Sequence, residues 1–135
     1  MTGGRIDANI ILRYLTNEPV EQAEGAARLF EAVARGDLEV LLEEVVIAEV
    51  LWTLSSFYRM PRRDIADVLL EVLAERNIHT TDSDAARLAL ILFSERNLDF
   101  ADALLAAKAL QSDDRIIYSF DRDFDRIQGV IRREP

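Results

Sequence analysis

Apolar residues recur along the chain at two spacings, one typical of helices and one typical of strands. Over residues 20–35 they stand three or four positions apart, as at Ala26, Phe30 and Val33, which is the period of an amphipathic helix. Helices are also predicted over residues 9–15, 44–58, 82–96 and 99–111, and another begins at Pro61. Short apolar or β-branched runs predict strands at residues 5–6, 38–42, 78–80, 115–120 and 130–131.

The alternation of these strands and helices predicts the fold class. Short strands separated by helices normally form a parallel sheet with helices on both faces. We therefore predict an α/β fold, a three-layer α/β/α sandwich around a short parallel sheet of four or five strands. The chain has no repeat, low-complexity tract or linker-like stretch, which indicates a single domain over residues 1–135.

The composition excludes several classes of protein. There is no cysteine, so disulfides and thiolate metal sites are excluded. No apolar run approaches the ~20 residues of a membrane span, and the first residues, MTGGRID, do not resemble a signal peptide. We expect a soluble, cytoplasmic protein.

The charge is acidic, with a net value of -9 at pH 7. A protein that coats nucleic acid through bulk electrostatics would be basic, so any nucleic-acid contact must be local. Lys108 is the only lysine among the 16 basic residues, and the others are arginines, which suit forked contacts to phosphate. The same bias is also typical of a GC-rich genome or a warm habitat.

One acid interrupts the most apolar segment of the chain. Every residue from Val45 to Trp52 except Glu49 is apolar. Such a helix is expected to be nearly surrounded by protein, which would place Glu49 at or near the interior. A carboxylate there needs an arginine, a proton or a metal ion. A buried ion pair with an arginine and a metal site remain equally open interpretations of Glu49.

Two further acids each follow a predicted strand directly. Asp7 comes after residues 5–6, and Asp121 comes after residues 115–120. The carboxyl ends of parallel strands share one edge of the sheet, where ligand sites form. The two side chains should therefore face the same crevice. Taken singly, Asp7 also fits a helix N-cap and Asp121 a turn residue.

A fourth acid, Asp102, falls in the first turn of the helix predicted over residues 99–111, with Asp99 at its N-cap. An acid at this position also fits simple complementarity to the helix dipole. However, Ala101, Ala103 and Leu104 flank it, which indicates a face packed against the sheet. That helix would begin at the same edge as Asp7 and Asp121.

Four carboxylates in one crevice repel one another unless cations lie among them. Oxygen ligands without cysteine, and with a single histidine in the chain, favour Mg²⁺ or Mn²⁺ over zinc. His79 lies in a predicted strand away from these segments, and we expect a structural role for it.

Four short motifs that carry these acids resemble, in order and spacing, those of the PIN-domain ribonucleases, especially the VapC toxins of VapBC toxin–antitoxin pairs. The motifs are residues 6–15 with Asp7 and Asn9, residues 46–50 with Glu49, residues 98–103 with Asp102, and residues 118–124 with Ser119 and Asp121. Two positions depart from the family pattern. Ala8 stands where the family usually has threonine, and Thr2-Gly3-Gly4 replaces the apolar residues of a longer first strand.

This resemblance implies Mg²⁺- or Mn²⁺-dependent cleavage of RNA by a metal-activated water, which leaves a 5′-phosphate. Asp7, Glu49 and Asp102 would form the main metal shell. Asp121 would bind a second ion or hold a water, and Ser119 would orient Asp121 or the water. The resemblance also implies a homodimer restrained by a small antitoxin protein. We expect local arginines to grip the RNA, with Arg13 and Arg122 as candidates.

Three other functions fit the sequence less well. A phosphoacceptor signalling domain would need paired acids after the first strand and a lysine after the last, whereas Asp7 stands alone and Lys108 lies in a predicted helix. An Asp-x-Asp phosphatase would need that pair where the sequence reads Asp7-Ala8-Asn9. The third alternative, a non-catalytic PIN-like scaffold, is opposed by the presence of all four acids.

Overall fold

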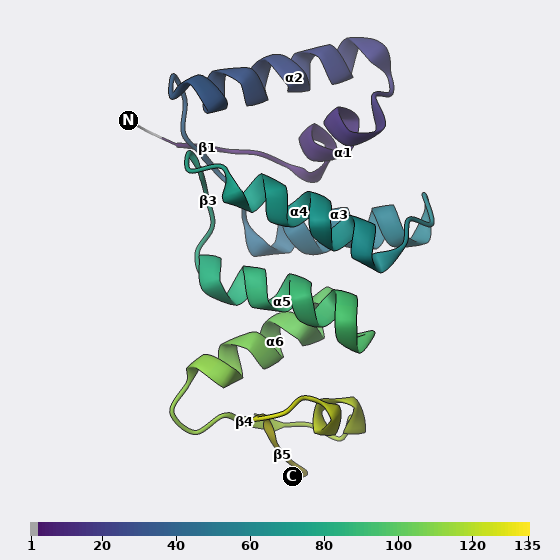
Figure 1. The fold of residues 1–135 in the computed structure, drawn as a ribbon, viewed down its shortest axis with the longest axis vertical. Helices are drawn as coiled ribbons and strands as arrows, with labels where there is room; N and C mark the ends of the chain where they lie inside the picture. Colours follow the sequence, from purple (N-terminus) through teal and green to yellow (C-terminus); the bar gives the residue numbers. More distant parts are fainter. Residues whose placement is uncertain (1–2) are drawn as a thin grey trace.

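In the computed structural model, which describes residues 3–135, six α-helices alternate with five short strands (Figure 1). The helices are α1 (Ala8–Thr16), α2 (Val20–Arg35), α3 (Glu44–Ser56), α4 (Arg62–Ala74), α5 (Ser83–Arg96) and α6 (Phe100–Gln111). The strands are β1 (Gly4–Arg5), β2 (Val40–Leu41), β3 (Ile78–His79), β4 (Ile116–Tyr118) and β5 (Ile131–Arg133), and a 3-10 helix η1 (Arg122–Arg126) lies between the last two. The predicted α/β class is confirmed, and the predicted elements differ from the observed ones only at their ends.

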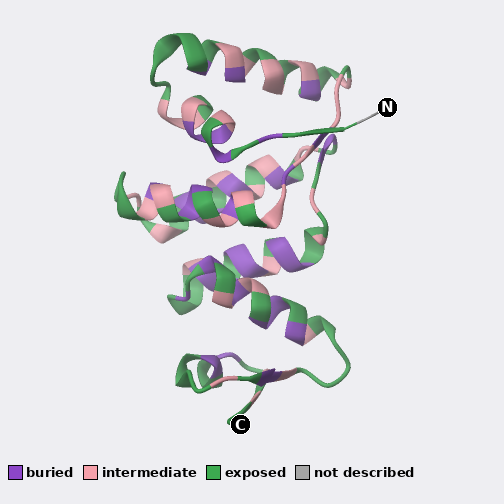
Figure 2. Ribbon diagram, turned by 180° about the vertical axis from the view of Figure 1, so that it is seen from behind, coloured by how far each residue is buried: buried purple, intermediate pink, exposed green. Residues whose placement is uncertain are grey.

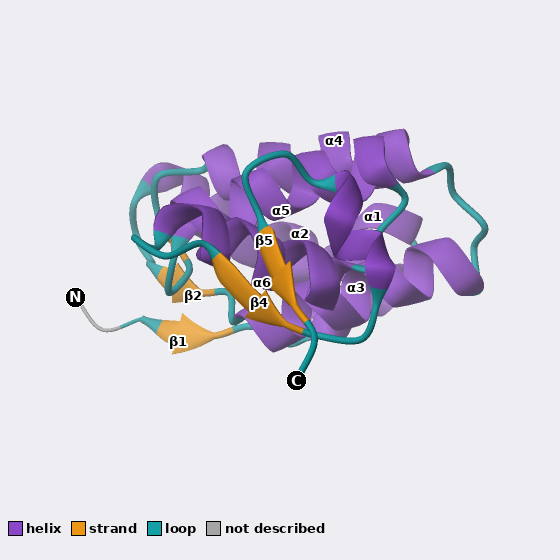
Figure 3. Cartoon of the chain, turned by 90° about the horizontal axis from the view of Figure 1, so that it is seen from below, coloured by secondary structure: helices purple, strands orange, loops and turns teal. Residues whose placement is uncertain are grey.

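The strands are parallel, as predicted, but they form two sheets instead of one. β1, β2 and β3 pair in that order, and β4 pairs with β5. Figure 3 shows β4 and β5 beside each other and β1 and β2 as a separate group. Within residues 3–135, β1 pairs only with β2, and both of its residues, Gly4 and Arg5, are exposed. The first strand is short, as expected from the glycines that replace apolar residues at its start. Thr2, the other residue of that departure, lies outside the described residues.

The helices lie on both sides of the first strand. Figure 1 shows α1 and α2 on one side of β1 and α3 and α4 on the other, followed by α5, α6 and the β4–β5 pair. Local signals stop three of the helices: α2 ends at Gly36 (φ 82°), α1 at Asn17 (φ 59°) and α5 at Asn97 (φ 53°), all in the left-handed conformation that closes a helix.

The core is formed by the inward faces of these helices, which Figure 2 shows as buried stripes. α5 and α6 pack against each other, and both contribute buried alanines to the core, including Ala86, Ala89, Ala103 and Ala106. Small side chains of this kind let two helices approach closely. Within residues 3–135 no helix combines the length and the apolar character that crossing a membrane requires.

Candidate active site

Asp7 stands between β1 and α1 and caps the helix. The backbone N–H of Ile10 donates to Asp7 Oδ1 at 3.2 Å, which satisfies one of the free donors of the first turn. Ile6 is buried and anchors the segment, whereas the carboxylate is exposed. The N-cap is therefore real, and it holds Asp7 at the carboxyl end of β1 with its second oxygen turned to solvent.

The structure corrects the predicted burial of Glu49. α3 is not surrounded by protein: Val45 is 75% exposed, Trp52 is 68% exposed, and Glu49 lies exposed between them. The buried side of α3 is a different stripe, formed by Ile47, Val50, Leu51 and Leu54. Residues four and three apart share a helix face, so Glu49 belongs to an apolar outer face. Apolar composition alone does not distinguish a core face from an exposed one.

Asp102 lies where burial and other acids both act on its carboxyl group. It lies half-buried in the first turn of α6, as predicted, after the N-cap residue Asp99. Burial raises the pKa of the Asp102 carboxyl, and the nearby charges of Asp99, Asp121 and Asp123 raise it further. The start of α6 and the start of η1 therefore bring four carboxylates into one electrostatic neighbourhood.

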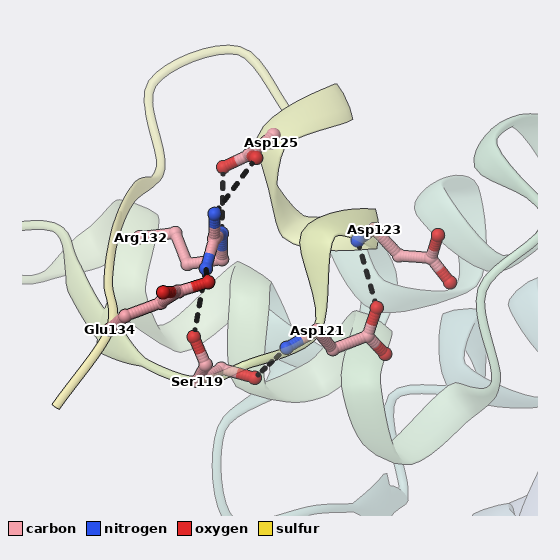
Figure 4. A network of polar contacts seen from close by, with 6 residues as sticks. All are labelled: Ser119, Asp121, Asp123, Asp125, Arg132 and Glu134. Atoms are coloured by element: carbon pink, nitrogen blue, oxygen red, sulfur yellow. Dashed lines mark hydrogen bonds and ion pairs between the residues drawn. The ribbon is translucent and has the colours of Figure 1, made fainter.

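Ser119 and Asp121 are joined through the backbone. The N–H of Asp121 donates to Ser119 Oγ at 2.9 Å, and the N–H of Asp123 donates to Asp121 Oδ1 at 2.9 Å (Figure 4). The carbonyl oxygen of Ser119 in turn accepts from Arg132 Nη1 at 3.0 Å. These bonds hold the turn after β4 and direct the Asp121 side chain away from the Arg132 side of the turn.

Two hollows connect the segments that carry the acids. A cavity of about 570 Å³ between α3 and the start of α6 is lined by Glu49 and Asp99. A second groove is lined by Glu49 together with Asn9 and Arg13 of α1. Glu49 thus lies between the helix that follows Asp7 and the helix that carries Asp102. The charge of Asp121, at the start of η1, acts on Asp102 in turn. We call the four predicted acids, which belong to the successive segments α1, α3, α6 and η1, the acid row.

The side chains in this row are not gathered into a cage. Among residues 3–135, no three Asp, Glu or His side chains are close enough together to hold a metal ion. The donor chemistry nevertheless fits a hard divalent cation. In the described part of the chain, none of Asp7, Glu49, Asp102 and Asp121 forms an ion pair with an arginine or lysine. Carboxylate oxygens without a protein counter-charge are the ligands that Mg²⁺ and Mn²⁺ prefer.

Sequence reasoning missed two acids of this neighbourhood as candidate site residues. Asp99 was assigned only a capping role, but its side chain makes no capping hydrogen bond and lines the cavity with Glu49. Asp123 was not singled out, but its charge acts on Asp102. Their spacings were the available signals, because Asp99 is three residues from Asp102 and Asp123 two residues from Asp121. His79 is not one of these acids or their neighbours; its Nε2 lies 3.2 Å from Glu39 Oε1.

Comparison with known families is decisive for the fold. The family model described as PIN domain matches residues 6–130, which enclose all four predicted acids. The chain belongs to the PIN-domain family. This PIN domain is similar to a VapC ribonuclease of Aquifex aeolicus (strain VF5), with 27% identity over 122 residues that cover 90% of each chain. The resemblance drawn from four short motifs is thereby confirmed.

Proposed function

We propose that this PIN domain is a metal-dependent endoribonuclease that hydrolyses phosphodiester bonds of RNA. The observation that carries the proposal is the position of Asp102 at the start of α6: burial raises the pKa of its carboxyl, and the charges of acids from two segments, Asp99 on one and Asp121 and Asp123 on the other, raise it further. The chain has 16 basic residues, yet within the described range none forms an ion pair with Asp102. The similarity to a VapC ribonuclease supports RNA as the substrate.

The residues divide the proposed chemistry among them. Asp7, Glu49 and Asp102 would hold Mg²⁺ or Mn²⁺, and a bound ion would lower the pKa of water and neutralise charge at phosphorus. Asp121 would either join the ligands of a second ion or orient the attacking water. Ser119 positions Asp121 through the hydrogen bond to its backbone N–H. Attack by water breaks the bond from phosphorus to the 3′ oxygen, which leaves a 5′-phosphate and a 3′-hydroxyl.

The direct test is cleavage of single-stranded RNA by the purified protein with Mg²⁺ or Mn²⁺, followed by sequencing of the product ends. We expect 5′-phosphate ends and complete inhibition by EDTA. Cleavage that EDTA leaves intact would contradict the metal assignment. RNA binding without any cleavage under these conditions would instead identify a non-catalytic PIN scaffold.

We further propose that the protein is a toxin that acts in the cytoplasm, where its RNA substrate lies, and that a small antitoxin restrains it. The row of unpaired acids is complementary to an arginine or lysine, which could enter it through charge-assisted hydrogen bonds. The exposed apolar face of α3, which includes Val45, and the exposed C-cap residue Phe57 suit a partner segment that orders on binding. The same face supports a homodimer.

The toxin proposal is tested separately from the nuclease. A neighbouring gene should encode a short protein with a DNA-binding end and a tail that carries a basic residue. Co-expression should rescue growth, and replacing that residue should restore cleavage while the complex persists. Harmless expression of this chain alone would contradict the toxin proposal and leave the nuclease proposal intact. Size-exclusion chromatography tests the dimer.

A further inference from the structure

Arg62, the first residue of α4, is held in place by neutral groups. Its Nη1 donates to the carbonyl oxygens of Phe93 at 2.8 Å and Leu98 at 2.7 Å, and its guanidinium lies 4.2 Å from the centre of the Phe93 ring. In the part of the chain that the structure describes, no carboxylate forms an ion pair with it. Arg62 therefore keeps a whole positive charge in an orientation fixed before any ligand binds.

Arg62 lines the cavity of about 570 Å³ that Glu49 and Asp99 also line. Ligand pockets for small molecules fall in the range of about 300–1,000 Å³, which accommodates one nucleotide. The other walls are formed by α3, including Trp52 and the hydroxyl residue Ser55. A fixed cation, a flat apolar wall and hydroxyl groups thus surround a space next to the proposed catalytic acids.

Trp52, which lines this cavity, is unusually exposed for a tryptophan. It is 68% exposed, although a tryptophan normally buries most of its surface. Exposed aromatic rings are the surfaces on which unpaired bases stack in proteins that bind single-stranded nucleic acid. A net charge of -9 opposes a broad electrostatic grip on RNA, so base stacking and a few local arginines, of which Arg62 is one, have to supply the affinity.

We propose that this cavity binds one nucleotide of single-stranded RNA, with its base stacked on Trp52 and its phosphate paired with Arg62. The inference rests on the proposed ribonuclease function and assigns that function a substrate subsite. The nucleotide in the cavity lies beside Glu49 and Asp99, so it sets which neighbouring phosphodiester bond reaches the acids. Because stacking reads every base, the subsite selects unpaired RNA and not a particular sequence.

The first experiment uses the fact that Trp52 is the only tryptophan of the chain. The protein is titrated in EDTA with a short oligouridylate while its intrinsic fluorescence is recorded, so that binding is measured without cleavage. We expect saturable quenching of the Trp52 emission. Binding of a labelled oligouridylate, seen by anisotropy, with no change in Trp52 emission would overturn the subsite.

Variants then separate stacking from charge. Trp52→Leu should weaken binding about tenfold or more, and Trp52→Phe, which keeps a ring, should weaken it less. Arg62→Gln should weaken binding and lower the slope of log affinity against log salt by about one, while Arg62→Lys restores the slope. The matched control is Arg63→Gln, because Arg63 is the next residue of α4 but lines a different hollow. It should bind as wild type.

Catalysis gives a second readout. With Mg²⁺ present, Trp52→Leu should raise KM with little change in kcat at saturating RNA, because stacking contributes equally to bound substrate and transition state.

If both the Trp52 and Arg62 variants bind and cut RNA as wild type does, the subsite is overturned while the proposed nuclease function stands. If wild type neither binds nor cuts RNA, the proposed function fails first. Quenching of Trp52 by a purified partner protein but not by RNA would assign the cavity to that partner and overturn the subsite.

Discussion

Two groups of carboxylates in the C-terminal part of the chain have opposite surroundings: Asp125 and Glu134 after β4, and Asp102 at the start of α6 together with Asp121 at the start of η1. Asp125 accepts from Arg132 Nε at 2.9 Å and from Nη2 at 3.2 Å, and Glu134 accepts from Nη1 at 3.1 Å (Figure 4). The hydrogen bond from Arg132 lowers the pKa of the Asp125 carboxyl. Burial and neighbouring acids raise the pKa of Asp102 instead.

The difference separates acids that hold the fold from acids that are free to bind a ligand. Arg132 also donates to the carbonyl of Ser119, so the paired group ties β5 to η1 and to the turn after β4. Asp121 starts the same 3-10 helix but, among the described residues, pairs with no basic side chain. Arg126 lies 3.5 Å from Asp123, so among the described residues of this neighbourhood Asp102 and Asp121 are acids that remain without a basic partner. The unpaired group is where a cation is expected.

The largest expected effect that tests this comparison is on catalysis. Asp102→Asn removes a charge from the unpaired group with almost no change in volume, so it should lower the cleavage rate by about 100-fold or more while the protein stays folded. Asp125→Asn removes a charge from the paired group and should leave the rate near that of wild type. Single-turnover cleavage of the same RNA measures both. Equal losses in the two variants would remove the distinction between the groups.

The next effect is on the salt dependence of RNA binding, which should differ between arginines that are paired with carboxylates and arginines that are not. Few phosphate contacts predict a slope of log affinity against log salt of only about 2–4. Arg13→Gln and Arg122→Gln should each reduce that slope by about one, whereas Arg132→Gln should leave it unchanged because Asp125 and Glu134 already neutralise Arg132. Anisotropy titrations in EDTA at several salt concentrations measure the slope. A slope typical of strongly basic binders would contradict a local grip.

A smaller effect is expected on metal-free stability. The charge of Asp121 contributes to raising the pKa of Asp102, so Asp121→Asn relieves repulsion and should raise the metal-free Tm by a few degrees. Asparagine keeps an oxygen that can accept from the N–H of Asp123. Mg²⁺ should raise the Tm of wild type more than that of the variant. Identical Mg²⁺-induced shifts would show that Asp121 is not part of the site.

The smallest effect is a pH dependence of opposite sign in the two groups. Asp102 has a pKa above 3.8 in the folded protein, so it lowers the free energy of unfolding as pH rises from 3.8 through that folded value. Asp125 has a folded pKa below 3.8, so its stabilisation is present above 3.8 and is lost as pH falls through the folded value. At neutral pH, Asp102→Asn should therefore be more stable than wild type and Asp125→Asn less stable. Urea unfolding across the acid range measures both, and the differences should vanish at the lowest pH.

Local sequence determined much of this protein. Asn17, Gly36 and Asn97 end their helices because their left-handed conformations depend on the residue itself and its immediate neighbours. Asp7 caps α1 for the same local reason. The α/β order and the four acid motifs are also sequence properties, and they were sufficient to predict the fold class and the family.

Tertiary structure decided which faces and charges are available. The apolar residues of α3 do not reveal that Glu49 and Trp52 share an outer face, because that depends on where the neighbouring helices pack. The strand pattern also does not reveal that β1, β2 and β3 form one sheet and β4 and β5 another, because pairing depends on how the chain packs. The neutral cradle of Arg62 joins residues 31 and 36 positions away, at Phe93 and Leu98. Contacts over such separations form only when the packing of α4 against α5 brings their backbones together, and no local pattern encodes them.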